Sequence, residues 1–183
     1  MSLADLLDEH LSGKILLPVW KDFQSRQGVY GSLDGKAKSN GEIGISIGGD
    51  MYMENPAITT EHCNAFAYIT AHAQEICDAI LSRLLLEYKN LQEEYGYGGE
   101  EANNIMPDVV DIAQFKDLIG LSQIHLLNVS KDNMAYVGYE FGCNWDDEHG
   151  IGFMTHKNRI VAFGGADTSF LTWVPEEDLE IEA

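Results

Sequence analysis

The chain has 183 residues, which is enough for one domain with a sizeable core or at most two small ones. Hydrophobic residues make up 45% of the sequence, the normal share for a packed globular protein, which argues against wholesale disorder. Acidic residues outnumber basic ones 30 to 11, and the formal charge of -19 argues against binding to nucleic-acid phosphates or anionic membranes.

The N-terminal third is predicted to contain a short helix followed by strands. The leucine pattern over residues 2–11 is amphipathic, and Ser2 can cap the helix that it predicts. Between residues 43 and 48, isoleucine alternates with glycine or serine, which is the period-two pattern of a strand. The predicted strands are residues 15–20, 28–32 and 42–48, and the polar, glycine-rich residues 33–41 are predicted to form a hairpin loop.

A long amphipathic helix is predicted over residues 61–95, with Thr59 or Thr60 as its cap and Gly96 as its stop. At roughly 1.5 Å per residue it would span about 52 Å, more than the width of a compact domain of this size. We therefore expect a bend, a break or a projecting end. Its apolar stripe recurs every three or four positions and is expected to be buried against the sheet: Ile69, Ile76, Ile80 and Leu84.

Residues 97–107 form the least core-like stretch and are predicted to be a mobile loop, because glycine, glutamate and asparagine dominate them. Apolar periodicity resumes directly afterwards, which argues against a linker between domains. A short helix, capped by Asp108 or Asp111, is predicted to end at Gly120.

The last third of the chain is predicted to form strands joined by short connections, which favours an antiparallel meander. The four strands are expected at residues 121–129, 134–142, 150–156 and 159–164. The acidic tail, residues 174–183, is expected to fray. The predicted class is α+β: a single domain, residues 1–183, whose antiparallel sheet combines this meander with the N-terminal strands and carries one long helix on a face.

The sequence has features typical of a cytoplasmic protein. It contains no apolar run long enough to span a membrane, and its acidic N-terminus does not resemble a signal peptide. Its three cysteines, Cys63, Cys77 and Cys143, show no disulfide framework and are expected to be free thiols in a reducing compartment.

The densest chemical cluster is a loop between two predicted strands, with Asp167 further along the chain. It contains Trp145, Asp146, Glu148 and His149. One hypothesis is structural: the acidic side chains bond nearby amides, Trp145 covers the end of the core and donates its indole N–H, and the glycines that follow allow close backbone approach. The other is a binding or metal site in which Asp146 or His149 meets Asp167. No known metal-binding motif is present, so no metal, cofactor or catalytic residue is assigned.

These residues also carry a resemblance. The pattern Trp145-Asp146-x-Glu148-His149-Gly150-x-Gly152, followed by Gly164-x-Ala166-Asp167, resembles an uncharacterised bacterial family built on a domain of unknown function. The similarity covers most of the chain loosely. The chain also loosely resembles toxin-immunity proteins. It implies a cytosolic bacterial domain, and it brings no established activity to these residues.

Two functions remain open from the sequence. The first is a non-enzymatic, immunity-type module that engages a basic protein partner, since strong negative charge speeds capture of a cationic protein. The second is an enzyme, or a small-ligand or metal binder, that uses the Trp145–His149 loop with Asp167. The oligomeric state is not indicated by any pattern in the sequence.

Overall fold

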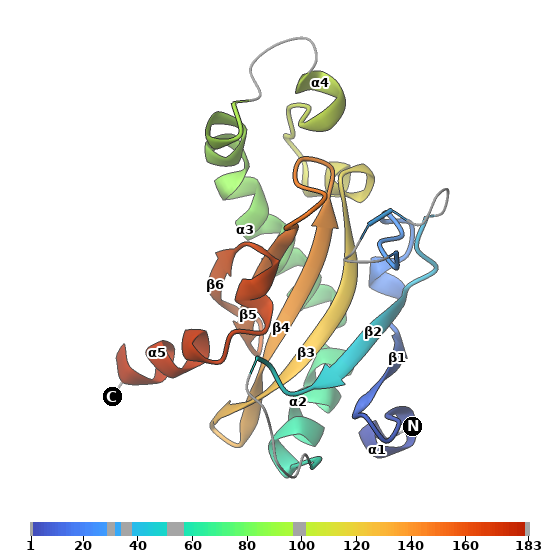
Figure 1. Cartoon of the computed structure of the whole chain (residues 1–183), viewed down its shortest axis with the longest axis vertical. Helices are drawn as coiled ribbons and strands as arrows, with labels where there is room; N and C mark the ends of the chain where they lie inside the picture. The colour runs from blue at the N-terminus through green and yellow to red at the C-terminus, as the bar shows by residue number, and fades with distance from the viewer. Residues whose placement is uncertain (1, 29–31, 34–37, 51–56, 97–101, 182–183) are drawn as a thin grey trace.

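The computed structural model describes residues 2–28, 32–33, 38–50, 57–96 and 102–181. Within these residues, six strands form one sheet whose spatial order follows the chain order (Figure 1). The strands are β1 (Ser12–Leu16), β2 (Glu42–Ile47), β3 (Ile119–Lys131), β4 (Met134–Cys143), β5 (Ile151–His156) and β6 (Arg159–Gly164). Strands β3 to β6 pair antiparallel in sequence, which confirms the predicted meander and the α+β class.

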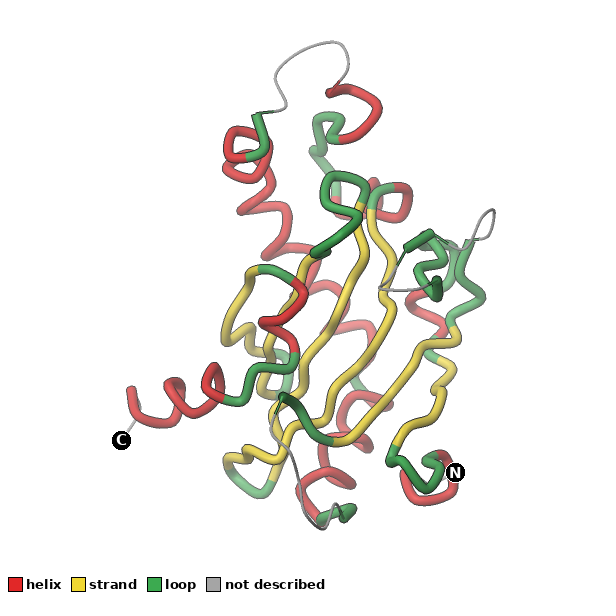
Figure 2. Tube along the Cα trace, in the orientation of Figure 1, coloured by secondary structure: helices red, strands yellow, loops and turns green. Residues whose placement is uncertain are grey.

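The pairing of β2 with β3 is parallel, whereas an antiparallel sheet was predicted. Parallel neighbours need a long crossover, and the two helices between these strands provide it. These helices, α2 (Thr60–Ala71) and α3 (Ala73–Glu94), run along one face of the sheet, behind it in Figures 1 and 2.

The predicted long helix is broken at His72, where φ is -116° and ψ is 25°, which confirms the expected bend or break. Thr59 caps α2 and forms a reciprocal capping box with His62. The predicted stripe is buried, and the exposed fraction of each of its members is 2% or less: Ile69, Ile76, Ile80 and Leu84. None of the described helices is both long and apolar enough to cross a membrane.

Two N-terminal predictions need correction. The helix α1 (Leu3–Leu6) ends early, because the Asp8 carboxylate accepts the backbone N–H groups of His10 and Ser12 and turns the chain into β1. The predicted strand over residues 15–20 holds only to Leu16. The residues that follow form a 3-10 helix, η1 (Pro18–Trp20), because proline cannot donate to a strand ladder and suits the first helical position.

Three further short helices lie between the larger elements: α4 (Ala102–Ile105), η3 (Ile112–Asp117) and η4 (Ala166–Ser169). Part of the predicted mobile loop at residues 97–107 is therefore helical, and residues 97–101 lie outside the described residues. Residues 29–31 of the predicted strand at 28–32 and residues 34–37 of the predicted hairpin loop at 33–41 also lie outside the described residues.

The acidic tail forms a helix, α5 (Trp173–Ile181), where a frayed segment was expected. Arg159 donates two hydrogen bonds to the Asp178 carboxylate, and the Tyr136 hydroxyl donates a third at 2.7 Å. These contacts, together with buried Val174, hold α5 against the sheet.

The sheet has two chemically different faces because side chains alternate along each strand. Isoleucine, leucine and aromatic side chains on the helix-covered face build the main core. On the opposite face, η4 and α5 cover the C-terminal strands over a small second cluster of Leu127, Tyr136, Met154 and Val174. The part of this face formed by β2, β3 and β4 carries polar side chains.

Candidate functional site

The loop that joins β4 to β5 is anchored by Trp145, whose exposed fraction is 4%. Its indole packs edge-on against the Tyr88 ring, with the centroids 5.6 Å apart. The predicted burial is therefore confirmed. The predicted hydrogen bond is not found: neither the indole N–H of Trp145 nor the hydroxyl of Tyr88 has a partner among the described residues.

Glycine permits the return of this loop into β5. Gly150 has a positive φ of 59°, and a Cβ at this position would lie 2.3 Å from the carbonyl oxygen of Phe141. A Cβ on Gly152 would lie 2.6 Å from the carbonyl oxygen of Gly165. Both glycines allow the close backbone approach that the sequence predicted.

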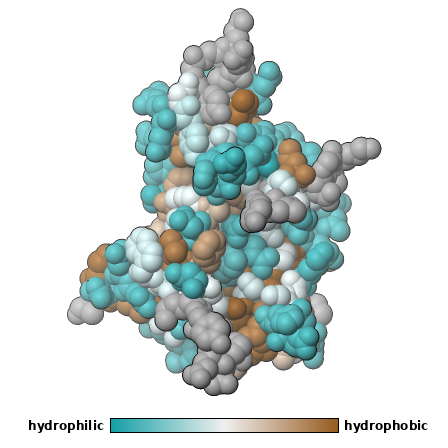
Figure 3. All heavy atoms as spheres, viewed as in Figure 1, coloured by the Kyte–Doolittle hydropathy of each residue, from teal (hydrophilic) through white to brown (hydrophobic). Residues whose placement is uncertain are grey.

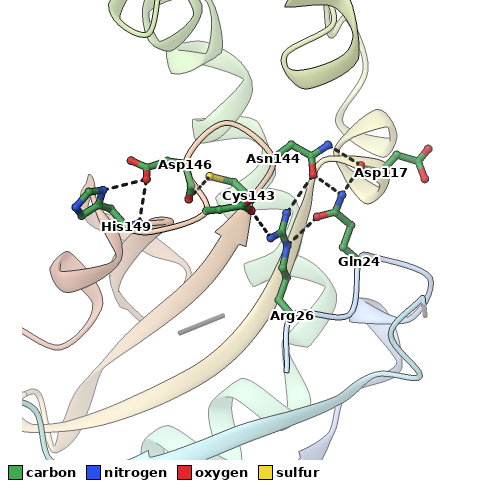
Figure 4. A network of polar contacts seen from close by, with 8 residues as sticks. Gln24, Arg26, Asp117, Cys143, Asn144, Asp146 and His149 are labelled. Atoms are coloured by element: carbon green, nitrogen blue, oxygen red, sulfur yellow. Dashed lines mark hydrogen bonds and ion pairs between the residues drawn. The ribbon is translucent and has the colours of Figure 1, made fainter. Parts of the chain in front are cut away.

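A buried arginine holds the start of the loop (Figure 4). The side chain of Arg26 is 0% exposed, and it donates to Gln24 Oε1 at 2.9 Å, Asn144 Oδ1 at 3.1 Å and Asp147 Oδ1 at 2.9 Å. Gln24 also donates to Asn144 Oδ1 at 2.7 Å. This clamp was not predicted from the sequence, because Arg26 and Asn144 lie 118 positions apart.

Asp146 organises the other side of the loop. One carboxylate oxygen accepts the Tyr95 hydroxyl at 2.7 Å, and the other accepts the backbone N–H of His149 at 2.9 Å and lies 3.0 Å from its ring Nδ1. Partial burial acts to raise the pKa of the Asp146 carboxyl, but the hydrogen bonds from Tyr95 and His149 outweigh it and lower the pKa. Asp146 is therefore ionised at neutral pH.

The same carboxylate acts on Tyr95. Burial, the hydrogen bond to Asp146 and the negative charge of that carboxylate all raise the pKa of the Tyr95 hydroxyl, so the phenol stays protonated and donates. The Tyr95 hydroxyl and the backbone N–H of His149 therefore both donate to the negatively charged Asp146 carboxylate and hold it in place.

These residues open onto a cavity of 390 Å³ between the end of α3 and strands β5 and β6. It is lined by acidic and polar side chains, by glycines and by the apolar side chains of Leu91, Ile151 and Phe163, without lysine or arginine. The lining residues that matter for charge are Glu87, Glu94, Tyr95, Asp146 and His149. A cavity of this size and charge suits a cationic side chain or a small cationic ligand.

Only two of the five predicted site residues line the cavity, Asp146 and His149. Trp145 lies in the core, and the exposed side chain of Glu148 makes no hydrogen bond to another described residue. Asp167 is exposed, and its side chain forms no hydrogen bond or ion pair with His149. The backbone nevertheless joins the two segments, because Ala166 N–H donates to the carbonyl of His149 at 3.2 Å.

The described residues contain no group of three or more His, Cys, Asp and Glu side chains placed to hold a metal ion. The buried histidines His62 and His156 each place Nε2 3.0 Å from a backbone carbonyl, and burial lowers the pKa of both imidazoles. These two side chains therefore serve as neutral structural hydrogen-bonding groups.

Comparison with known proteins places the chain in a family. A family model described as a domain of unknown function, DUF6985, matches residues 13–171, nearly the whole chain. The chain belongs to the DUF6985 family. No curated protein and no solved structure matches it. The matched DUF6985 segment begins within β1 and ends before α5, so it contains the loop, the cavity and the Arg26 clamp.

Proposed function

We propose that this DUF6985 protein is an immunity-type binding module that captures a basic protein partner in the bacterial cytosol, and that this capture is non-enzymatic. The cavity at the end of α3 is its recognition site. The observation that carries the proposal is the excess of carboxylates there, where Glu87, Glu94 and Asp146 line a cavity that has no lysine or arginine in its lining.

The position of Glu94 makes this charge unusual. The C-terminus of a helix carries partial negative charge, so acidic residues there reduce stability and basic residues are preferred. The last turn of α3 has no basic residue and ends in Glu93 and Glu94. Glu94 has no ion-pair or hydrogen-bond partner among the described residues. A cation bound beside it would neutralise both the carboxylate and the helix end.

The other two carboxylates of the cavity, Glu87 and Asp146, have different roles. Glu87 is paired with Arg83 at 3.0 Å, which leaves it partly neutralised in the free protein. Asp146 is held by Tyr95 and His149 and fixes the wall of the cavity. A guanidinium group suits such a site, because its planar set of donors can bond two carboxylates at once.

The net charge of -19 supports the same proposal at longer range. A strongly negative field speeds encounter with a basic protein and repels acidic ones. The three cysteines are free thiols, and this state suits the reducing compartment that the proposal includes.

The test begins with affinity capture from the native host, followed by kinetic measurement of binding to the captured partner. Glu94→Lys should weaken binding of a basic partner by about 100-fold, since it places a positive charge inside the recognition site. Glu9→Lys is the matched control. Glu9 is exposed on the N-terminal segment, and its replacement by lysine changes the net charge by the same amount as Glu94→Lys. A partner without excess positive charge, or equal weakening by both variants, would contradict the proposal.

A further inference from the structure

A second cluster of chemically active side chains lies on the sheet face opposite the helices, away from the cavity. It consists of Ser46 on β2, His125 on β3 and Glu140 on β4. Ser46 Oγ lies 3.2 Å from His125 Nδ1, and His125 Nε2 lies 2.8 Å from Glu140 Oε2. Each of the three residues comes from a different, adjacent strand.

Sheet register creates this arrangement. Ser46 pairs directly with His125 in the parallel β2–β3 ladder, so their side chains project from the same face. A register shift between Leu121 and Gln123 sets Glu140 opposite Gln123, two residues before His125 on the same face. Glu140 then reaches His125 diagonally, a distance that long side chains span across neighbouring strands.

With Glu140 ionised, one assignment of the His125 ring proton satisfies both hydrogen bonds. An ionised Glu140 can only accept, so His125 Nε2 carries the proton in that bond. In the neutral imidazole, Nδ1 is then the acceptor and the Ser46 hydroxyl donates to it. This is the polarity that a general base needs in order to activate a serine, with a carboxylate orienting the base.

The cluster is accessible from solvent. The exposed fractions of the His125 and Glu140 side chains are 15% and 25%, and Ser46 is half-buried. In Figure 3, hydrophilic residues face the viewer over the central strands, where β3 and its neighbours lie in Figure 1. A reagent can therefore approach from this face.

The surroundings supply two further elements of a reaction site. The Gln123 side chain crosses the face above Gly44, where a Cβ would lie 2.0 Å from Gln123 Oε1. Its amide has no hydrogen-bond partner among the described residues and is free to donate to a developing oxyanion. The Phe170 ring packs against the imidazole of His125 at 5.6 Å and gives an apolar wall.

From this geometry we propose that Ser46 is a nucleophile that hydrolyses small, uncharged carboxylic esters. Ser46 Oγ bonds to the ester carbonyl carbon while its proton moves to His125 Nδ1. The bond from that carbon to the alkoxy oxygen then breaks, and the leaving alcohol takes the proton from His125. A water molecule then attacks the acyl carbon and gives one proton to His125 Nδ1. The bond from that carbon to Ser46 Oγ breaks, His125 returns the proton to Ser46 Oγ, and the carboxylic acid is released. Glu140 is a positioning residue that stabilises the charged imidazole.

The test uses the purified full chain, an uncharged fluorophosphonate probe that reacts with activated serines, and p-nitrophenyl acetate. The probe should form one adduct on Ser46 by release of fluoride, and Ser46→Ala should lose both the adduct and ester hydrolysis. His125→Gln should slow both reactions by about 100-fold, within the usual range for loss of a general base. Glu140→Gln should slow hydrolysis and shift the midpoint of its pH profile downward, a change that a purely structural role would not produce.

Ser122→Ala is the matched control. Ser122 is also half-buried on β3, but its hydroxyl donates to the backbone carbonyl of Glu140 at 2.9 Å and does not contact an imidazole. This variant should keep full labelling and hydrolysis. Absence of a Ser46 adduct on the folded protein, or labelling that persists unchanged in His125→Gln, would overturn the proposal. Binding of a basic partner through Glu94 is unaffected by either result.

Discussion

The indole of Trp145 meets the ring of Tyr88 edge-on, with the ring planes at 72°, and this contact joins the β4–β5 loop to α3. Both side chains are almost fully buried, and each leaves one polar atom without a partner among the described residues. The loop is thus held mainly by apolar packing at Trp145 and by the polar clamp at Arg26. The first prediction concerns the apolar anchor.

Replacement of Trp145 by alanine should lower the free energy of unfolding by about 3–5 kcal/mol, because it removes a buried aromatic ring and leaves a cavity. Urea denaturation measures this change. Trp173→Ala is the control, since the side chain of Trp173 is 51% exposed and should contribute little. A similar loss in both variants would show that the Trp145 contact is not the anchor.

The second prediction concerns α3. Ile80 is 0% exposed within the core, and Ile80→Ala should cost about 2–5 kcal/mol of unfolding free energy. Leu86 lies on the same helix but is 77% exposed, so Leu86→Ala should change the stability by less than about 0.5 kcal/mol. A loss below about 1 kcal/mol for Ile80→Ala would contradict the assignment of the buried stripe.

Local patterns predicted the elements whose signals are periodic. The isoleucine alternation in β2, the stripe along α2 and α3, and the short turns of the meander each depend on neighbouring residues, and all three were confirmed. The parallel β2–β3 pair was missed because its crossover joins segments over 70 positions apart. The helical state of α5 was missed because Asp178 meets Arg159 and Tyr136 only in the folded protein.

The candidate sites show the same limit. The local composition of the sequence indicated the Trp145–His149 loop and predicted the burial of Trp145. It could not pair Asp146 with Tyr95, which lies 51 positions earlier at the C-cap of α3. Nor could it bring Ser46 to His125, because strand register places them side by side. A site that depends on such long-range contacts has no characteristic local spacing of residues by which the sequence could indicate it.

The third prediction separates the residues that hold the loop from those that face the cavity. His149→Ala should reduce the unfolding free energy by less than about 1 kcal/mol, because the His149 side chain is 75% exposed and surface pairs contribute little. Arg26→Met should cost about 2–3 kcal/mol, because it removes buried, charge-assisted hydrogen bonds at similar volume. Thermal or urea unfolding of both variants checks the order. A larger loss for His149→Ala would make that histidine the anchor.

The fourth prediction concerns acid stability. The hydrogen bonds from Arg159, foremost, and from Tyr136 lower the pKa of Asp178 from its usual 3.8 to about 2. Because the pKa is lower in the folded state, this carboxylate stabilises the fold above pH 4, and the contribution declines as the pH falls toward 2. Its upper value is about 2 kcal/mol, reduced by solvent around the partly exposed Arg159.

Asp178→Asn should therefore destabilise the protein at pH 7 and flatten the fall in stability between pH 4 and pH 2. Unfolding free energies measured by urea denaturation across this range test the expectation. Glu176→Gln is the control, since Glu176 is exposed on the same helix and makes no described side-chain contact. An unchanged pH profile in Asp178→Asn would show that this carboxylate does not stabilise the packing of α5.

The last prediction concerns the rate of partner capture. The net charge of -19 acts on a partner over about one Debye length, which is about 30 Å at 0.01 M salt and about 8 Å at 0.15 M. The association rate with a basic partner should therefore fall by about 10-fold or more over this range, whereas the dissociation rate, set by short contacts at Glu94 and Asp146, should change much less. Stopped-flow or surface-based kinetics at several salt concentrations separate the two rates. An association rate that stays flat would mean that long-range charge does not steer the encounter, and the carboxylates of the cavity would then act only after contact.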